Sequence, residues 1–153
     1  GVERRIEISS RAGGIEPWMV LKNTNITVKE RNLIKGALRR VFSRSEHRKV
    51  VLARVVVPAE SVPAPIREER SRVKTWCKCE SCGAYLAKSE VEVDHIVPIV
   101  PLDQPFEDMS LDVFIDRLWA TPDQLQGICE TCHKAKTSAE TKERARHRKL
   151  RKA

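Results

Sequence analysis

Two Cys-x-x-Cys pairs, Cys79–Cys82 and Cys129–Cys132, lie on either side of the dipeptide Asp94-His95, and the second pair runs directly into His133. A Cys-x-x-Cys segment is a tight turn that points two sulfurs at one centre. Two such turns supply the four ligands of a tetrahedral structural zinc site. Asp94, His95 and His133 are residue types suited to an open site for a catalytic cation. The spacing therefore predicts a closed metal site beside an open one.

Disulfide bonds are the main alternative for these cysteines. Four of the five cysteines fall in the two pairs, and the N-terminus has no signal-peptide pattern, so reduced thiols that hold zinc are favoured. A redox role for a single Cys-x-x-Cys would leave the second pair and the Asp-His dipeptide unexplained. The fifth cysteine, Cys77, is interpreted as a spare thiol because Cys79 has the usual spacing to Cys82.

The chain resembles the HNH endonuclease family, in particular the small HNH nucleases of bacteriophages. The resemblance rests on the first cysteine pair, on Glu92-Val-Asp-His-Ile-Val-Pro98, on Phe114-Ile-Asp-Arg-Leu118 and on Gln124-Leu-Gln-Gly-Ile-Cys-Glu-Thr-Cys-His-Lys-Ala-Lys-Thr137. It covers approximately residues 76–140. The first part of the chain matches only loosely, through Gly36-Ala-Leu-Arg-Arg-Val-Phe42.

The resemblance implies an α+β fold: a ββα-metal (treble-cleft, His-Me finger) nuclease core stabilised by a four-cysteine zinc and preceded by a basic helical hairpin. It assigns Asp94 and His133 as ligands of a catalytic divalent cation, Mg²⁺, Mn²⁺ or another, and His95 as the general base. The family's Asn that orients the base is replaced here by Gln124. Asp123 or a backbone carbonyl could orient His95 instead.

The function implied is a divalent-metal-dependent DNA endonuclease of nicking or homing type, with double-stranded DNA as its partner. For a phage-encoded enzyme, the expected location is the cytoplasm of an infected host. The alternative is a non-catalytic, zinc-stabilised module that binds nucleic acid. Such a module would have no need of Asp94, His95 and His133 together. No apolar run is long enough to span a membrane.

The net charge of +8 favours a polyanionic partner. Basic residues crowd residues 29–54 and the tail from residue 142, whereas residues 103–123 are acidic. A basic run is often only a solvated face, but here two basic blocks flank the nuclease-like motif. The candidate DNA contacts are Arg39, Arg40, Arg117, Lys134, Lys136, Arg144 and Arg146. For Arg117, an ion pair with Asp112 or Asp116 is an equal alternative.

Hydrophobic periodicity predicts the elements that hold these residues. Thr27 and Glu30 form a capping box before a helix that ends near Phe42, with Lys35 on its polar face. A second helix follows over residues 45–56, and Pro58–Pro65 is expected to be a linker or a semi-extended crossover. The predicted organisation is therefore a poorly ordered segment at 1–26, the helical hairpin and linker at 27–65, the nuclease domain at 66–140 and a basic tail at 141–153.

Within the nuclease domain, residues 72–76 and 90–96 are predicted strands, and 98–109 an irregular loop. Residues 111–119 are a predicted helix, 121–124 a turn, and the helix that carries His133 is expected to begin at Ile128. Gly83 is expected to close the turn of the first cysteine pair.

Overall fold

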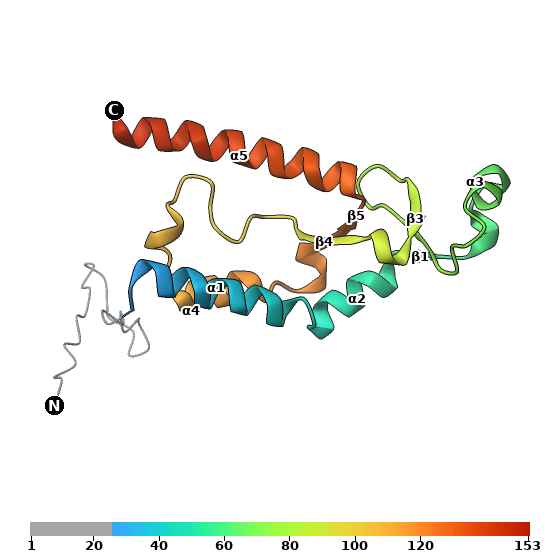
Figure 1. Cartoon of the computed structure of the whole chain (residues 1–153), viewed down its shortest axis with the longest axis horizontal. Coiled ribbons are helices and arrows are strands. Elements are labelled where there is room, and N and C mark those ends of the chain that lie inside the picture. The colour runs from blue at the N-terminus through green and yellow to red at the C-terminus, as the bar shows by residue number, and fades with distance from the viewer. Residues whose placement is uncertain (1–25) are drawn as a thin grey trace.

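The computed structural model describes residues 26–153, so the predicted poorly ordered segment at 1–26 lies, except for Ile26, outside the described residues. The described chain is an α+β protein with two small antiparallel sheets (Figure 1). Its helices are α1 Val28–Phe42, α2 Glu46–Arg54, α3 Ala64–Glu69, α4 Leu111–Leu118 and α5 Glu130–Lys152. Its strands are β1 Val56–Val57, β2 Trp76–Lys78, β3 Tyr85–Ala87, β4 Glu92–His95 and β5 Leu125–Ile128.

The predicted start of α1 is confirmed. The Thr27 hydroxyl accepts a hydrogen bond from the Glu30 backbone N–H, and the Glu30 carboxylate accepts one from the Thr27 N–H, which together form a capping box. Ser45 caps α2 in the same way, through the N–H of Arg48. The two helices do not form the expected hairpin, however. Figure 1 shows α2 running onward from the end of α1 instead of folding back along it.

The buried face of α1 differs from the prediction. Lys35 was expected on the polar face, yet it is 0% exposed, while Leu33 and Val41 are 65% and 59% exposed. The Lys35 ammonium donates a hydrogen bond to the Phe106 carbonyl at 2.5 Å and lies 3.8 Å from the centre of the Phe106 ring. The carbonyl and the ring together compensate for the lost hydration of the charge.

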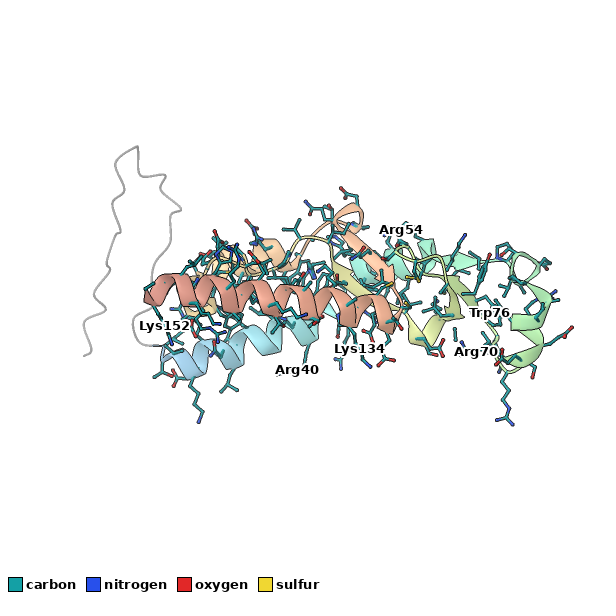
Figure 2. All side chains as sticks on the ribbon, turned by 90° about the horizontal axis from the view of Figure 1, so that it is seen from above. Arg40, Arg54, Arg70, Trp76, Lys134 and Lys152 are labelled. Atoms are coloured by element: carbon teal, nitrogen blue, oxygen red, sulfur yellow. The ribbon has the colours of Figure 1, made fainter. Side chains whose placement is uncertain are left out.

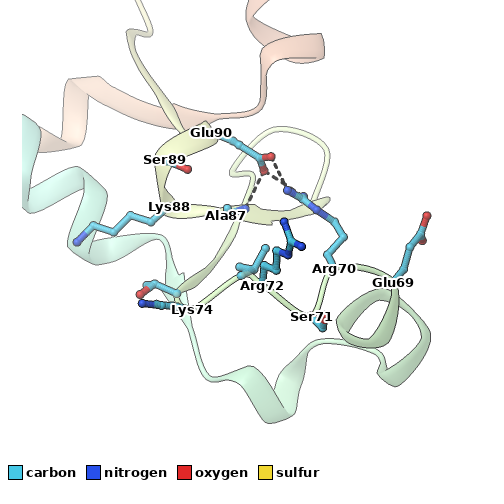
Figure 3. A pocket seen from close by; sticks show the side chains of 11 residues that line it. Glu69, Arg70, Ser71, Arg72, Lys74, Ala87, Lys88, Ser89 and Glu90 are labelled. Carbon is cyan, nitrogen blue, oxygen red and sulfur yellow. Dashed lines mark hydrogen bonds and ion pairs between the residues drawn. The ribbon is translucent and has the colours of Figure 1, made fainter.

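The proline-rich segment contains short helical elements. Residues 59–61 form a 3₁₀ turn and α3 follows directly, so the segment folds into a small projection at one end of the molecule (Figure 1). This projection is tied to the 3₁₀ turn after β3, residues 88–90, by the Arg70 guanidinium, which donates to both oxygens of the Glu90 carboxylate (Figure 3). The strand predicted to begin at Arg72 begins only at Trp76.

The loop between β4 and α4 is held from two sides. On one side, Lys35 and Arg31 of α1 donate to the carbonyls of Phe106 and Met109. On the other, Arg144 and Arg151 of α5 donate to the carbonyls of Val100 and Asp103. The loop is thereby fixed between α1 and α5, which lie on either side of it in Figure 1.

Strands β4 and β5 pair antiparallel, with Asp94 opposite Gln126 and His95 opposite Leu125. Strand β5 leads through Cys129, the N-cap of α5, into the long C-terminal helix. The prediction that the helix begins at Ile128 was wrong, because that residue ends β5. No strand was predicted here because Gly127 breaks the apolar pattern.

The packing around Gly127 explains why this position has no side chain. A Cβ atom at this position would lie 2.9 Å from Val55 Cγ1 and 3.2 Å from Val91 Cγ1, and both valines are buried.

We expect Gly127→Ala to reduce the free energy of unfolding by about 1–3 kcal/mol, the usual cost of overpacking a core. Gly36→Ala is the matched control, because an added Cβ on α1 meets nothing closer than 3.7 Å and removes a helix-interior glycine. It should stabilise the protein slightly. Urea unfolding of both variants measures the difference, and equal stabilities would contradict this account.

Candidate functional site

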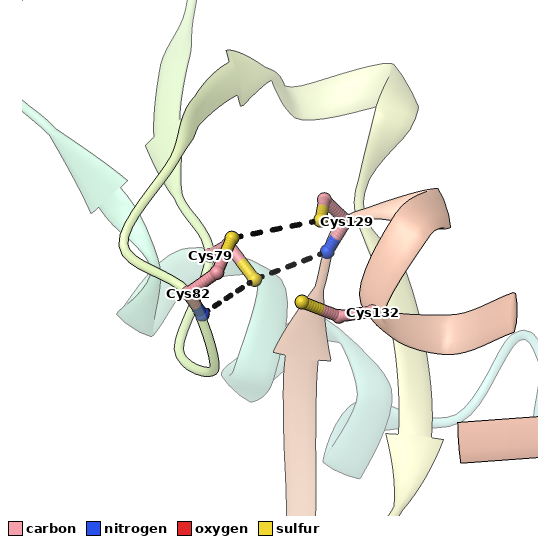
Figure 4. A group of neighbouring side chains, drawn as sticks. All are labelled: Cys79, Cys82, Cys129 and Cys132. Carbon is pink, nitrogen blue, oxygen red and sulfur yellow. Dashed lines mark hydrogen bonds between the residues drawn. The ribbon is translucent and has the colours of Figure 1, made fainter. Parts of the chain in front are cut away.

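The four paired cysteines converge on one point. The Sγ atoms of Cys79, Cys82, Cys129 and Cys132 all lie within 4.8 Å of one another (Figure 4). The Sγ atoms of Cys82 and Cys129 are 3.8 Å apart. This matches the edge of a ZnS₄ tetrahedron, which is about 3.8 Å for Zn–S bonds of about 2.3 Å. The cluster is therefore compatible with a structural zinc site.

Backbone geometry shapes each cysteine turn. Gly83 has a φ of +75°, a left-handed conformation that glycine adopts without strain, and its N–H donates to the Cys79 carbonyl. The Cys79 sulfur accepts backbone N–H bonds from Cys82 at 3.5 Å and Cys129 at 3.3 Å. Cys77 is buried in the neighbouring apolar cluster and does not belong to the four-sulfur group.

The thiols of the cluster differ in acidity. Burial raises the pKa of Cys79, but backbone N–H groups of Cys82, Cys129 and Ser81 outweigh it and lower the pKa to about 6. A hydrogen bond with Ser81 lowers the pKa of Cys132, yet the neighbouring thiols of Cys129 and Cys82 raise it to about 11. Four thiolates so close together repel one another, so a bound cation is needed to hold all four ionised.

The first cysteine turn is joined to β5. The Glu80 N–H donates to the Gly127 carbonyl, and the Gly127 N–H donates to Glu80 Oε1 at 3.0 Å. Arg54 of α2, labelled in Figure 2, donates to the same carboxylate and to the carbonyls of Pro122 and Leu125. Through these bonds the cysteine cluster fixes the strand that pairs with β4.

A second group of polar residues surrounds an open cavity of about 320 Å³. The strand β4 contributes Asp94 and His95, and one face of α5 contributes His133, Lys136, Glu140 and Arg144 at positions i, i+3, i+7 and i+11. Arg39 and Arg48 line it from α1 and α2. The structure thus places Asp94, His95 and His133 around the same cavity.

Asp94 and His133 could share a divalent cation. Asp94 Oδ1 lies 4.0 Å from His133 Nε2. Mg²⁺ binds its ligands at about 2.1 Å, so two donor atoms up to about 4.2 Å apart can reach one ion. A carboxylate with an imidazole also suits Mn²⁺. The donor types therefore fit such a cation, and the cavity leaves room for water or phosphate as further ligands. Adjacent ligands of an octahedral Mg²⁺ lie about 3.0 Å apart, so the two side chains would approach each other by about 1 Å on binding it.

The other oxygen of Asp94 is already bonded. Asp94 Oδ2 lies 3.0 Å from the Lys136 Nζ and accepts a hydrogen bond of 3.2 Å from the Gln126 amide. Lys136 also pairs with Glu140, one helical turn further along α5. Burial lowers the pKa of Lys136, but its bonds to Glu140 and Asp94 raise it above the ordinary value overall. Lys136 therefore stays charged.

His95 is held as a neutral imidazole. Its Nε2 atom lies 2.7 Å from the Leu118 carbonyl, so Nε2 carries the proton and Nδ1 keeps the lone pair of a base. Burial lowers the pKa of His95, and although Leu118 and Asp94 oppose this, Arg39 and Lys136 lower it further. The ring packs 5.2 Å from that of Phe42, which steadies its plane.

Gln124 is not brought to the imidazole. Its side-chain oxygen accepts a hydrogen bond from the Thr121 N–H at 3.2 Å and closes the turn before β5, while its backbone carbonyl accepts from the Ile96 N–H. Asp123 is exposed on the same turn and bonded to Thr121. The geometry favours the third alternative, a backbone carbonyl, which belongs to Leu118. Gln124 instead supports the end of β4 from the neighbouring turn.

The predicted DNA contacts have varied surroundings. Arg117 donates to the carbonyls of Ile99 and Pro98, and Arg144 donates to those of Val100 and Pro101, so both hold the loop. Arg146 pairs with Glu143, and Lys134 with Glu130, on exposed parts of α5. Arg39 lines the cavity, and Arg40 is exposed on α1.

Three residues near the cavity were not predicted from the sequence as part of the site: Gln126, Glu140 and Arg48. Glu140 could have been found from its helical spacing to His133, since residues seven apart share a face. Gln126 could have been found only by recognising β5 as the partner of β4. Arg48 had no signal that distinguished it from the other basic residues of α2.

Comparisons with protein-family models, with curated proteins and with solved structures found no match. Among the helices at residues 26–153, none combines the length and apolar character that crossing a membrane requires.

Proposed function

We propose that this protein is a zinc-stabilised, divalent-metal-dependent DNA endonuclease with a ββα-metal core of the HNH type. The observation that carries the proposal is the placement of Asp94 Oδ1 and His133 Nε2, 4.0 Å apart, in the same cavity as His95. A strand pair followed by a helix, β4–β5–α5, supplies all three residues. The proposed fold class and activity both rest on this arrangement.

In the proposed reaction, His95 Nδ1 removes a proton from a water molecule in the cavity while the Leu118 carbonyl holds the ring through Nε2. The oxygen of that water bonds to phosphorus as the bond to the leaving alkoxide breaks. A divalent cation held by Asp94 and His133 would stabilise the charge on the phosphate and the leaving oxygen. Arg39 and Arg48 add positive charge at the cavity wall where the phosphate enters.

Double-stranded DNA is the proposed substrate because basic side chains lie outside the cavity as well. Arg40 on α1 and Lys134 and Lys152 on α5 are labelled in Figure 2, and Figure 1 shows these two helices on either side of the loop between β4 and α4. Binding that relies on such phosphate contacts weakens steeply with salt. A phage-encoded nicking or homing enzyme remains the proposed type, acting in the cytoplasm of the host.

A non-catalytic zinc module that binds nucleic acid is the second candidate, and the basic surface alone would support it equally. The two candidates separate in one experiment. A labelled duplex is incubated with the zinc-loaded protein, with and without Mg²⁺ or Mn²⁺, and is run on native and denaturing gels. The endonuclease proposal expects binding in both cases and strand breaks only with the added cation. Binding without any breaks under every cation would favour the second candidate.

The pH dependence of cleavage follows from His95. A general base must be unprotonated, and the pKa of His95 lies below its ordinary value of 6.5, chiefly because of burial. A bound cation would lower it further. We therefore expect the inflection of the cleavage rate to lie below pH 6.5. Single-turnover rates across acidic and neutral pH measure the inflection, and an inflection at or above the ordinary histidine value would contradict the assignment.

A further inference from the structure

The two carboxylate oxygens of Asp94 have different surroundings. Oδ1 is turned toward His133 Nε2 at 4.0 Å. Oδ2 is occupied by the Lys136 ammonium at 3.0 Å and by the Gln126 amide at 3.2 Å. The carboxylate therefore has one oxygen available to a cation in the cavity and one bonded to protein donors.

Lys136 is restrained at this position. Its side chain is 24% exposed, and it is paired with Glu140 as well as Asp94. Glu140 lies one helical turn beyond Lys136 on α5, so the two side chains meet without distorting the helix. Gln126 reaches the same oxygen from β5, directly opposite Asp94 in the strand pair. Two elements thus converge on Oδ2.

We propose that Lys136, braced by Glu140 and assisted by Gln126, restricts Asp94 to ligation through Oδ1 alone and thereby selects Mg²⁺ and Mn²⁺ over Ca²⁺. This inference rests on the cation site of the proposed function and names a determinant of its specificity. Lys136 is a positioning residue, because it acts on the cation through Asp94.

The selectivity follows from coordination preferences. Ca²⁺ takes six to eight oxygen ligands at roughly 2.3–2.6 Å and often binds both oxygens of one carboxylate, whereas Mg²⁺ prefers near-ideal octahedral geometry at about 2.1 Å and keeps several waters. A carboxylate with only one free oxygen satisfies the smaller ion and deprives the larger one of a ligand. Removal of the donors from Oδ2 would restore the bidentate mode.

The test measures cation binding without DNA. Protein loaded with one equivalent of zinc is titrated with Mn²⁺, the free ion is followed by electron paramagnetic resonance, and Ca²⁺ or Mg²⁺ is then added as competitor. In Lys136→Met, the preference for Mn²⁺ over Ca²⁺ should fall by about tenfold, the lower end of the effects seen when a partner of a metal ligand is removed. Loss of a positive charge should tighten both ions, so the ratio of affinities is the readout.

Two further variants separate the bond from the charge. Lys136→Arg retains a cationic donor and should preserve most of the preference. Lys134→Met makes the same chemical change on an exposed part of the same helix, where the lysine pairs with Glu130, and should leave the ratio unchanged. Asp94→Asn should abolish Mn²⁺ binding at this site.

The failures are distinguishable. Unchanged selectivity in Lys136→Met, with Mn²⁺ still bound through Asp94, would overturn this inference and leave the proposed function standing. Absence of any Mn²⁺ binding beyond the zinc in the unmodified protein would overturn both the inference and the cation site of the proposed function.

Discussion

Replacing His95 by alanine should lower the rate of DNA cleavage by about two to four orders of magnitude, the usual contribution of a general base. DNA binding should be nearly unchanged, because the imidazole acts on water and not on the phosphate backbone. Its Nε2 bond to Leu118 holds the ring and leaves Nδ1 to accept the proton. Single-turnover cleavage and gel-shift measurements on the same preparation give the two quantities.

His47→Ala is the matched control for this variant. His47 also bonds a backbone carbonyl, that of Ala120 at 2.9 Å, but it does not line the cavity. It should therefore change stability without the large loss of rate. Unfolding curves for both variants exclude misfolding as the cause. A His95→Ala protein that cleaves at the unmodified rate would show that another group is the base.

Loss of zinc should unfold the half of the protein that contains the cysteine cluster. The apolar core beside the cluster is small and includes Cys79 itself, together with Val55, Leu86, Val91 and Ile128. Structural zinc sites supply about 10–16 kcal/mol of binding free energy, which becomes folding free energy when the apo site is disordered. Cys82→Ser, or treatment with a strong chelator, should therefore abolish the cooperative unfolding transition of this part of the chain.

Zinc content and circular dichroism measure this effect together. Cys77→Val is the control, because Cys77 is buried among apolar side chains outside the four-sulfur cluster, and the variant should keep one zinc per chain. A soluble, folded preparation of the unmodified protein that contains no zinc would contradict the prediction.

Local signals in the sequence were sufficient for the features that depend on nearby residues. The capping box at Thr27, the glycine at the cysteine turn and the helix at 111–118 each depend on side chains a few positions apart. The strand β5 was missed because its pairing with β4 joins residues about thirty positions apart, and Gly127 interrupts its pattern. Lys35 could not be predicted as buried, because its partner carbonyl belongs to a distant loop.

The candidate site shows the same division. Residue types and spacing predicted the cluster of four sulfurs, whose geometry zinc chemistry constrains strongly. They also suggested that Asp94, His95 and His133 form one group. The hydrogen bonds that hold these residues in place could not be predicted from residue types and spacing. The carbonyl that holds His95 comes from the end of α4, where any residue type would present the same oxygen. The amide that bonds Asp94 comes from a strand whose register the sequence did not reveal.

The most direct test of the account is the conversion of supercoiled plasmid by zinc-loaded protein with Mg²⁺ or Mn²⁺, followed on an agarose gel. The unmodified protein should produce nicked or linear DNA only when the cation is added. Asp94→Asn, with its zinc content intact, should produce nicked and linear DNA much more slowly than the unmodified protein. Cleavage that persists at the full rate in the presence of a chelator that spares the zinc, or in Asp94→Asn, would contradict a cation held by Asp94 and His133.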